Sequence, residues 1–187
     1  MTLSNDYSSY AIPNSELVKT LKLMKHPEGG YFVETDRQSD QVPSPFAGQA
    51  LRPLATSIYY LLTPDEPNGV IHMNKSATMH VLHQGRAEYT LITPGSPPKV
   101  MGPNIHAGEV LQLLVPTGVW KMSRLLEEDL AAASTESSKD HCGCLITEVV
   151  FPGFAWEDHG FLTKEGLEEI FGVNAPETKE LLKYVKA

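Results

Sequence analysis

The sequence is poor in cysteine, in cationic residues and in long hydrophobic runs, and each shortage excludes a class of protein. Cys142 and Cys144 are the only cysteines among 187 residues, and two positions apart on a strand they suit neither a disulfide nor paired zinc ligands. Fifteen Lys and Arg against 23 Asp and Glu give a formal net charge of −8, which argues against nucleic-acid binding. No apolar run approaches the ~20 residues of a membrane-spanning helix.

The N-terminus is equally short of targeting features. The stretch MTLSNDYSSYAIPNSE has neither a basic region nor an apolar segment, so we expect no secretory signal. With so few cysteines, a reducing, cytoplasmic location is the default prediction. The length suits one domain with a sizeable core. We predict a flexible lead-in over residues 1–14, a main domain over 15–165 and a helical C-terminal extension over 166–187.

Short apolar segments separated by Gly and Pro turns dominate the middle of the chain. Many strands without alternating helices indicate a sandwich or barrel rather than a βαβ sheet. Helical spacing of apolar residues predicts a helix from about Glu16 to Met24, another that ends at Gly172, and a last one opened by Pro176. The fold class is therefore mainly β, a barrel or jelly roll with helical ends.

Two polar segments interrupt this pattern. Residues 39–53 are rich in Ser, Pro, Gln and Gly, which predicts a loop that is able to close over a site. The stretch from Glu127 to Asp140 combines charged and small residues, and we interpret it as a surface loop or a short disordered insert.

Three of the seven histidines fall within twelve residues, at positions 72, 80 and 83. Histidine titrates near neutral pH and ligates metals, so this stretch is the first candidate for chemistry. A buried, hydrogen-bonded core histidine is an equally good interpretation of His72. His80 and His83 are three apart on a strand and face opposite ways, so at most one is interior. The remaining histidines (His26, His106, His141 and His159) lie in predicted turns and are expected at the surface.

Polar residues inside apolar strands are the next candidates. Glu148 lies within LITEVVF, and burying a carboxylate costs several kcal/mol unless it is paired. It therefore either faces solvent or has an interior partner, and we favour the interior. Gln112 is polar in a similar strand and is expected to line a cavity. Trp120, just after a tight turn, is a candidate for stacking on a ligand ring, although core packing is the commoner role of tryptophan.

An early strand supplies further candidates for ligand binding. In YFVETDR, Glu34 shares a face with Phe32, which is unusual for a core strand. Arg37 either binds a phosphate or carboxylate bidentately or pairs with a neighbouring acid. We add Tyr31 and Tyr60 to the candidate ligand-binding residues, together with His80.

These motifs resemble a known family. The segments HPEGGYFVETDR, HQGRAEYTL, HAGEVLQLLVPTGVW and ITEVVFPGF are similar to the cupin superfamily, and most closely to Cupin_5, domain of unknown function 985. The resemblance covers roughly residues 15 to 165. It implies a jelly-roll barrel with an interior small-molecule or metal site.

The general cupin metal pattern is incomplete here. His72 keeps one motif position, but Asn74 stands where a second histidine belongs, and Arg124 lies near the place of the histidine in the second motif. Metal sites need three or four converging ligands, so we predict no metal and no other cofactor. A metal-dependent oxygenase or hydrolase, with His80 and Glu148 in an unusual ligand set, is the least favoured alternative. Ala77-Thr78 replaces an acidic pair of other family members.

The chain more distantly resembles the metal-free dTDP-4-dehydrorhamnose 3,5-epimerases. That resemblance implies His72 as a base and Glu148 as the carboxylate that orients it. The epimerase lysine aligns with Thr78, and no equivalent tyrosine stands out. We therefore predict a small-molecule-binding cupin for a polar, anionic or carbohydrate-like ligand, with a metal-independent epimerase or isomerase as the alternative. A homodimer is expected, because cupins commonly pair through sheet edges.

Overall fold

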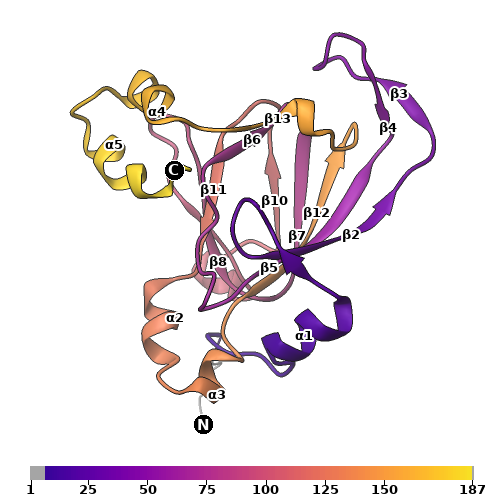
Figure 1. Ribbon diagram of the computed structural model, residues 1–187. Coiled ribbons are helices and arrows are strands. Elements are labelled where there is room, and N and C mark those ends of the chain that lie inside the picture. The colour runs from indigo at the N-terminus through magenta and orange to yellow at the C-terminus, as the bar shows by residue number, and fades with distance from the viewer. Residues whose placement is uncertain (1–6, 187) are drawn as a thin grey trace.

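The computed structural model describes residues 7–186, which form two antiparallel β-sheets packed face to face as a jelly-roll barrel (Figure 1). The larger sheet has six strands in the spatial order β1 (Met24–Lys25), β2 (Tyr31–Arg37), β5 (Thr56–Leu62), β12 (Cys144–Phe151), β7 (Ala77–Gly85) and β10 (Gln112–Val115). The mainly β fold predicted from the spacing of apolar segments and turns is confirmed.

The smaller sheet has five strands, and a separate hairpin projects beyond the barrel. The five strands follow the order β13 (His159–Phe161), β6 (His72–Asn74), β11 (Lys121–Arg124), β8 (Ala87–Leu91) and β9 (Lys99–Met101). The hairpin pairs β3 (Gln41–Pro43) with β4 (Leu51–Pro53) and stands clear of the sheets in Figure 1. The loop expected over residues 39–53 is thus partly a strand pair.

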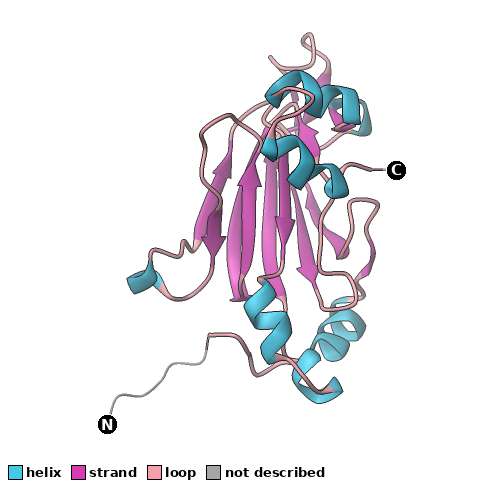
Figure 2. Cartoon of the chain, turned by 90° about the vertical axis from the view of Figure 1, so that its left-hand side faces the viewer, coloured by secondary structure: helices cyan, strands magenta, loops and turns pink. Residues whose placement is uncertain are grey.

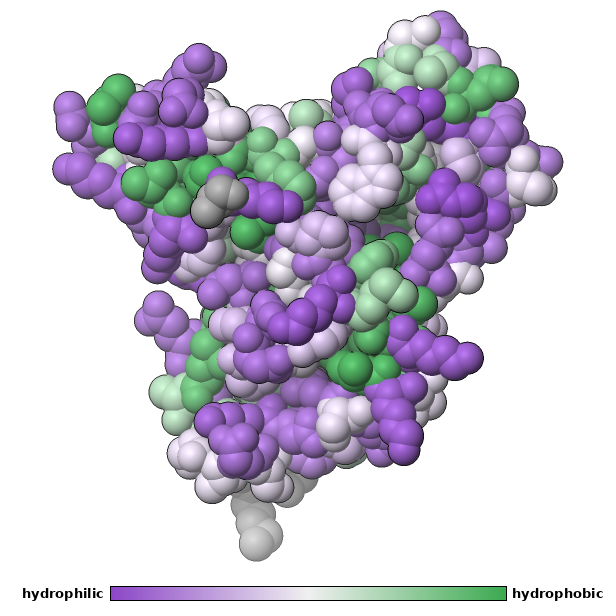
Figure 3. Space-filling view, in the orientation of Figure 1, coloured by the Kyte–Doolittle hydropathy of each residue, from purple (hydrophilic) through white to green (hydrophobic). Residues whose placement is uncertain are grey.

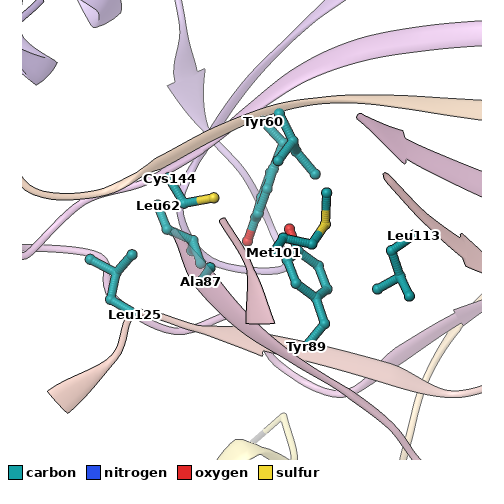
Figure 4. Packing of buried hydrophobic residues seen from close by; sticks show 9 residues of the cluster. Tyr60, Leu62, Ala87, Tyr89, Met101, Leu113, Leu125 and Cys144 are labelled. Carbon is teal, nitrogen blue, oxygen red and sulfur yellow. The ribbon is translucent and has the colours of Figure 1, made fainter. Parts of the chain in front are cut away.

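The core between the two sheets follows from the period-two alternation of the strands. Inward-facing side chains of β5, β8 and β12 meet in one cluster, in which the rings of Tyr60 and Tyr89 turn their hydroxyl ends toward the middle (Figure 4). Aliphatic residues and Cys144 fill the rest of this cluster. Both cysteines are free and buried.

Helices cover the outer faces and ends of the barrel (Figure 2). The helix α1 (Asn14–Leu21) packs Leu17 against the outer face of the larger sheet, where Tyr10 also lies. The helices α4 (Lys164–Phe171) and α5 (Pro176–Leu181) bury Leu167 and Leu181 against the outer face of the smaller sheet. Residues 1–6 of the expected lead-in lie outside the described residues. No helix in the described part of the chain is long and apolar enough to cross a membrane.

The expectation of a loop or disordered insert from Glu127 to Asp140 is wrong. Two short helices occupy this stretch, α2 (Glu127–Ala132) and α3 (Glu136–Lys139). The side chain of Thr135 caps α3 by accepting the Ser138 N–H, and buried Asp129 of α2 is bound by Arg86. Capping and an ion pair thus order a segment that hydrophobic patterning does not mark.

Candidate functional site

A cavity of about 460 Å³ lies between β2, β5, β12, the projecting strand β4 and the segment 154–157. Phe32, Ile58, Val150 and the aromatic pair Phe154 and Trp156 supply its apolar walls. Figure 3 shows hydrophobic residues at the surface below the β3–β4 hairpin, on the same side of the molecule. We call this cavity the outer chamber.

A much smaller void lies deeper in the barrel. Its volume of about 10 Å³ leaves room for roughly one water. Its walls are Glu28, Tyr60, His72, His80, Tyr89, Lys121, Met122, Ser123 and Glu148. Glu28 and Glu148 line both spaces, so these two carboxylates stand at the boundary between the outer chamber and the inner void.

Glu28, in the loop between β1 and β2, is surrounded by imidazoles. Its Oε1 accepts a hydrogen bond from His159 Nε2 at 2.6 Å, and its Oε2 lies 3.2 Å from His72 Nε2 and 3.5 Å from His26 Nδ1. Burial raises the pKa of Glu28, but His72 and the hydrogen bond from His159 outweigh burial and lower the pKa to about 2. Glu28 is therefore an ionised, buried carboxylate.

His72 has one ring nitrogen fixed and the other free. Its Nδ1 lies 2.8 Å from the Val70 carbonyl, which only accepts, so Nδ1 carries the hydrogen. Its buried Nε2 has no hydrogen-bond partner, although Glu28 Oε2 lies 3.2 Å away. Burial lowers the pKa of His72 to about 4 against the opposing attraction of Glu28. At neutral pH the ring is uncharged, with the lone pair on Nε2.

Glu148 belongs to a second cluster of charged and polar groups that line the void. Lys121 Nζ donates to Glu148 Oε1 at 2.7 Å and to His80 Nε2 at 2.8 Å. Burial raises the pKa of Glu148, but the charge of Lys121 outweighs burial and holds the pKa well below its ordinary value. Burial, followed by the charge of Lys121, lowers the pKa of His80. Lys121 is thus a buried ammonium group shared by a carboxylate and an imidazole.

Several candidates from the sequence meet in this interior. His72, His80, Glu148 and Tyr60 are all buried and line the void, and Glu148 has the interior partner that its burial requires. His83 faces the opposite way and contacts Thr147. The expected pairing of His72 with Glu148 is wrong, because the carboxylate nearest to His72 is that of Glu28 and Glu148 is bound by Lys121.

Glu34 and Arg37 line the mouth of the outer chamber. The guanidinium of Arg37 donates to both carboxylate oxygens of Glu34, at 2.7 and 3.1 Å, and to the Phe154 carbonyl at 3.2 Å. A register shift between Glu34 and Asp36 turns Arg37 to the same face as Glu34, although the two are three residues apart.

Three residues expected to bind the ligand lie outside the site. Tyr31 is on the outer face of β2, where its hydroxyl donates to Asp65. Gln112 is exposed on β10, because Leu113 is the residue of this pair that faces the core. Trp120 packs with the C-terminal helices on the outside of the smaller sheet. None of the three lines the outer chamber or the inner void.

Four functional residues are missed by sequence reasoning. His26 and His159 are expected at the surface, yet their side chains are only 8% and 2% exposed and both contact Glu28. Glu28 lies in a Gly-rich turn, and Lys121 follows a tight turn. For neither residue do alternating apolar neighbours indicate which way the side chain points. The HPEGG motif itself is the available signal for Glu28.

The side chains of the site are not arranged to bind a metal ion. In the described residues no group of three or more His, Cys, Asp and Glu side chains is arranged to hold one. The carboxylates and imidazoles that meet here are engaged with one another, and Lys121 places a positive charge within the second cluster. The residues present do not fit a cupin metal centre.

Comparisons with known proteins agree with this architecture. The model of the family Cupin_5, described as cupin superfamily (DUF985), matches residues 15–162. The uncharacterised protein YML079W of Saccharomyces cerevisiae is 40% identical over 172 residues, which cover 87% of this chain and 80% of the relative.

Two solved structures are similar over nearly their whole length. A hypothetical protein from Leishmania major has a TM-score of 0.72 at 25% identity, with 90% of this chain and 97% of that chain covered. A protein from Shewanella oneidensis has a TM-score of 0.73 at 24% identity, with 95% and 99% covered. None of these descriptions names an activity.

Proposed function

The chain belongs to the Cupin_5 family of the cupin superfamily, whose description names no activity, and we propose from its pocket that it is a metal-independent isomerase or epimerase for a small, carbohydrate-like ligand. The observation that carries this proposal is that neutral His72 lines the inner void together with ionised Glu28 and that its buried Nε2 has no hydrogen-bond partner. Perturbed titratable groups of this kind gather at catalytic sites.

The proposed chemistry is proton transfer at a carbon next to a carbonyl group. Nε2 of His72 takes the proton from carbon, and the electron pair of the broken C–H bond moves onto the carbonyl oxygen as an enolate. The imidazolium that forms lies 3.2 Å from the Glu28 carboxylate, which stabilises it. Lys121 is the nearby cation for the enolate oxygen. Protonation of the same carbon by water from the opposite face gives the epimer, and His72 then releases its proton to solvent. Return of the proton from His72 to the former carbonyl carbon, with transfer of the neighbouring hydroxyl proton to the enolate oxygen, gives the isomer.

A binding module without turnover is the second candidate. It is favoured by the difference in size between the two spaces, because about 460 Å³ holds a small ligand whereas about 10 Å³ does not. A ligand confined to the outer chamber would touch Glu28 and Glu148 but not the free nitrogen of His72. Catalysis therefore requires the carbonyl end of the ligand to enter the inner void, which must widen to admit it.

Exchange of carbon-bound hydrogen tests the proposal. Aldoses, ketoses and 4-keto sugars are incubated with the protein in D₂O, and loss of C–H signals is followed by NMR. We expect exchange by the wild type and a rate at least about 100-fold lower for His72→Gln. His83→Gln is the matched control and retains the wild-type rate, because His83 lies on the outer face of β7, in the larger sheet, and contacts Thr147.

Undiminished exchange by His72→Gln would remove His72 from the base role. A sugar that shifts the NMR signals of the outer chamber without any exchange would favour the binding module.

We further propose that the protein is a homodimer in the cytoplasm. The support is the edge strand β10. Leu114 in this strand and Leu111 just before it are each about half exposed. The free cysteines accord with a reducing compartment.

A further inference from the structure

We infer that the ligand of the outer chamber presents hydroxyl or ammonium donors and carries no phosphate or carboxylate group. The inference rests on the proposed function only in taking the outer chamber as the ligand site. It deepens that proposal by choosing between the anionic and the carbohydrate-like ligand, and it does not depend on proton transfer.

The first observation is that the cations around the chamber are already bound by carboxylates. Arg52 donates to both oxygens of Asp158, at 2.6 and 3.2 Å, from a pair whose side chains are only 15% and 6% exposed. Arg37 is bound in the same bidentate way by Glu34. A guanidinium group recognises a phosphate or carboxylate by the same pair of N–H donors. In both arginines these donors are already bound by a carboxylate of this chain.

The second observation is that the floor of the chamber presents acceptors. Glu28 and Glu148 are ionised, and Lys121, which lines the inner void with them, is engaged by Glu148 and His80. Asn74 also lines the chamber, and its Oδ1 atom is buried and has no hydrogen-bond partner. An unpaired buried acceptor is costly, and a ligand O–H or N–H group satisfies it.

An anionic ligand needs cations or hydrogen-bond donors, whereas the floor of the outer chamber offers negative charges and acceptors. It would bring its charge against two ionised carboxylates in a partly water-excluded space, where like charges repel strongly. A polyol or amino sugar would instead donate to Glu28, Glu148 and Asn74, while the aromatic walls at Phe154 and Trp156 cover the apolar face of its ring.

The two arginine–carboxylate pairs differ in how exposed they are, and so in how easily a mutation frees the arginine. The pair of Arg37 and Glu34 lies at the mouth, with side chains 42% and 44% exposed, whereas Arg52 is held deeper by Asp158. Removing the charge of Glu34 therefore frees a guanidinium at the entrance without unpacking the barrel. The structure thus assigns Glu34 as the residue that excludes anions.

The test is NMR titration of the full chain with three matched probes: glucosamine, glucose and glucose 6-phosphate. The indole N–H of Trp156 in the chamber wall is the reporter, and that of Trp120, outside the chamber, is the internal control. For the wild type we expect glucosamine and glucose to shift Trp156, and glucose 6-phosphate to bind at least about tenfold more weakly than glucosamine.

Glu34→Gln is expected to tighten glucose 6-phosphate binding at least about fivefold. Asp36→Asn is the matched control, because it removes an equal charge from the same strand but does not contact Arg37, and it should leave the order of the probes unchanged. The same order in His72→Gln would show that selectivity persists when proton transfer is lost, which separates this inference from the proposed reaction.

Three results would overturn the inference. They are binding of glucose 6-phosphate by the wild type as tightly as glucosamine, equal behaviour of Glu34→Gln and Asp36→Asn, and failure of both glucose and glucosamine to shift Trp156.

Discussion

Lys121 and Glu148 form a buried ion pair whose members depend on each other. Their side chains are 3% and 9% exposed, and the charge of each is compensated by the other at 2.7 Å. Removing one partner leaves an uncompensated charge in the interior, which typically costs about 3–5 kcal/mol. We therefore expect Lys121→Met to lower the free energy of unfolding by about 3 kcal/mol or more, as measured by urea denaturation.

A double-mutant cycle checks this prediction. Lys121→Met combined with Glu148→Leu removes both charges, so we expect the double variant to be more stable than Lys121→Met alone. Additive losses in the two single variants would show that the pair is not coupled.

His72 makes stability depend on pH. Its pKa is lowered by burial from 6.5 to about 4, so between these values the unfolded chain binds more protons than the folded chain. Stability is therefore complete above about pH 6.5 and falls as the pH drops toward 4. The pKa values of His26 and His80 are lowered by burial too and act in the same direction. Below about pH 4.5, protonation of Glu28 in the unfolded chain adds a further loss.

Urea unfolding at pH 7, 6, 5 and 4.5 measures this dependence. For His72→Gln we expect a slope shallower than that of the wild type by up to about 1.4 kcal/mol per pH unit, the value for one proton. His106→Gln, at an exposed turn, is the control variant. Equal slopes for His72→Gln and the wild type would mean that the His72 ring does not titrate differently on folding.

At the residue scale, strand alternation predicts only the residues that lie within regular strands. It places Glu34 beside Phe32 and His80 opposite to His83, as the structure has them, whereas the interior position of Glu148 is favoured by the need of a buried carboxylate for a partner. It fails for Glu28 and His159, because a turn or a strand end aims a side chain by local backbone geometry rather than by period. For this reason Glu28, the carboxylate beside His72, is not predicted from the sequence.

At the scale of elements, the turn that carries Glu28 contains Gly29 and Gly30, which both have a positive φ. Gly29 has a φ of 92°, and a Cβ at this position would clash with the Asn68 carbonyl oxygen. We expect Gly29→Ala to lower the free energy of unfolding by more than 1 kcal/mol and to displace Glu28 from His72 and His159. Thermal unfolding and the NMR signals of the two imidazoles measure these effects.

Gly48 in the β3–β4 hairpin offers the matched control for this substitution. Its φ of 59° is also positive, but a Cβ there meets nothing within 4 Å. Gly48→Ala should therefore cost only the local backbone strain and leave both imidazole signals in place. An equal loss for the two variants, with unshifted imidazoles, would contradict a positioning role of the Gly29 turn.

Element prediction succeeds where hydrophobic periodicity is strong and fails where polar contacts order the chain. The helix ended by Gly172 and the one opened by Pro176 are where their apolar stripes and end residues indicate. In contrast, α2 and the hairpin of β3 with β4 carry few apolar residues, and α2 is fixed through Asp129 by Arg86. Such long-range ion pairs have no signature in local sequence.

At the scale of the whole molecule, the jelly roll brings distant segments into one site. Glu28 lies before β2, His72 on β6, Lys121 on β11 and Glu148 on β12, and these strands belong to two sheets. The sequence motifs and their turn spacing predict this barrel. They do not predict which loop residue completes the pocket, because the pairing of sheets is set by the total core and the loops adapt to it.

The outer face of the larger sheet carries an apolar row that reaches the open edge at β10. Leu114 pairs in register with Met79, and Met79 in turn pairs with Val149, so one apolar row crosses three strands. Leu114 is 49% exposed in the single chain, and an unpaired edge with such a face favours association with a second copy. We expect the wild type to be a dimer at micromolar concentration, and Leu114→Lys to be a folded monomer because its ammonium group would be buried unpaired at the interface. Sedimentation velocity measures both states.

Leu182→Lys is the matched control for the proposed dimer, because this leucine is similarly exposed, at 41%, but belongs to the C-terminal segment whose Tyr184 packs on the smaller sheet, whereas β10 is an edge of the larger sheet. It should leave the dimer intact, which separates a specific interface from a general effect of added charge. A dimer formed through β10 would also bear on the site, because β7 carries Met79 on its outer face and His80 on its inner face. A monomeric Leu114→Lys variant with unchanged Trp156 titrations would show that pocket and interface are independent, whereas a dimeric variant would rule out β10 as the contact.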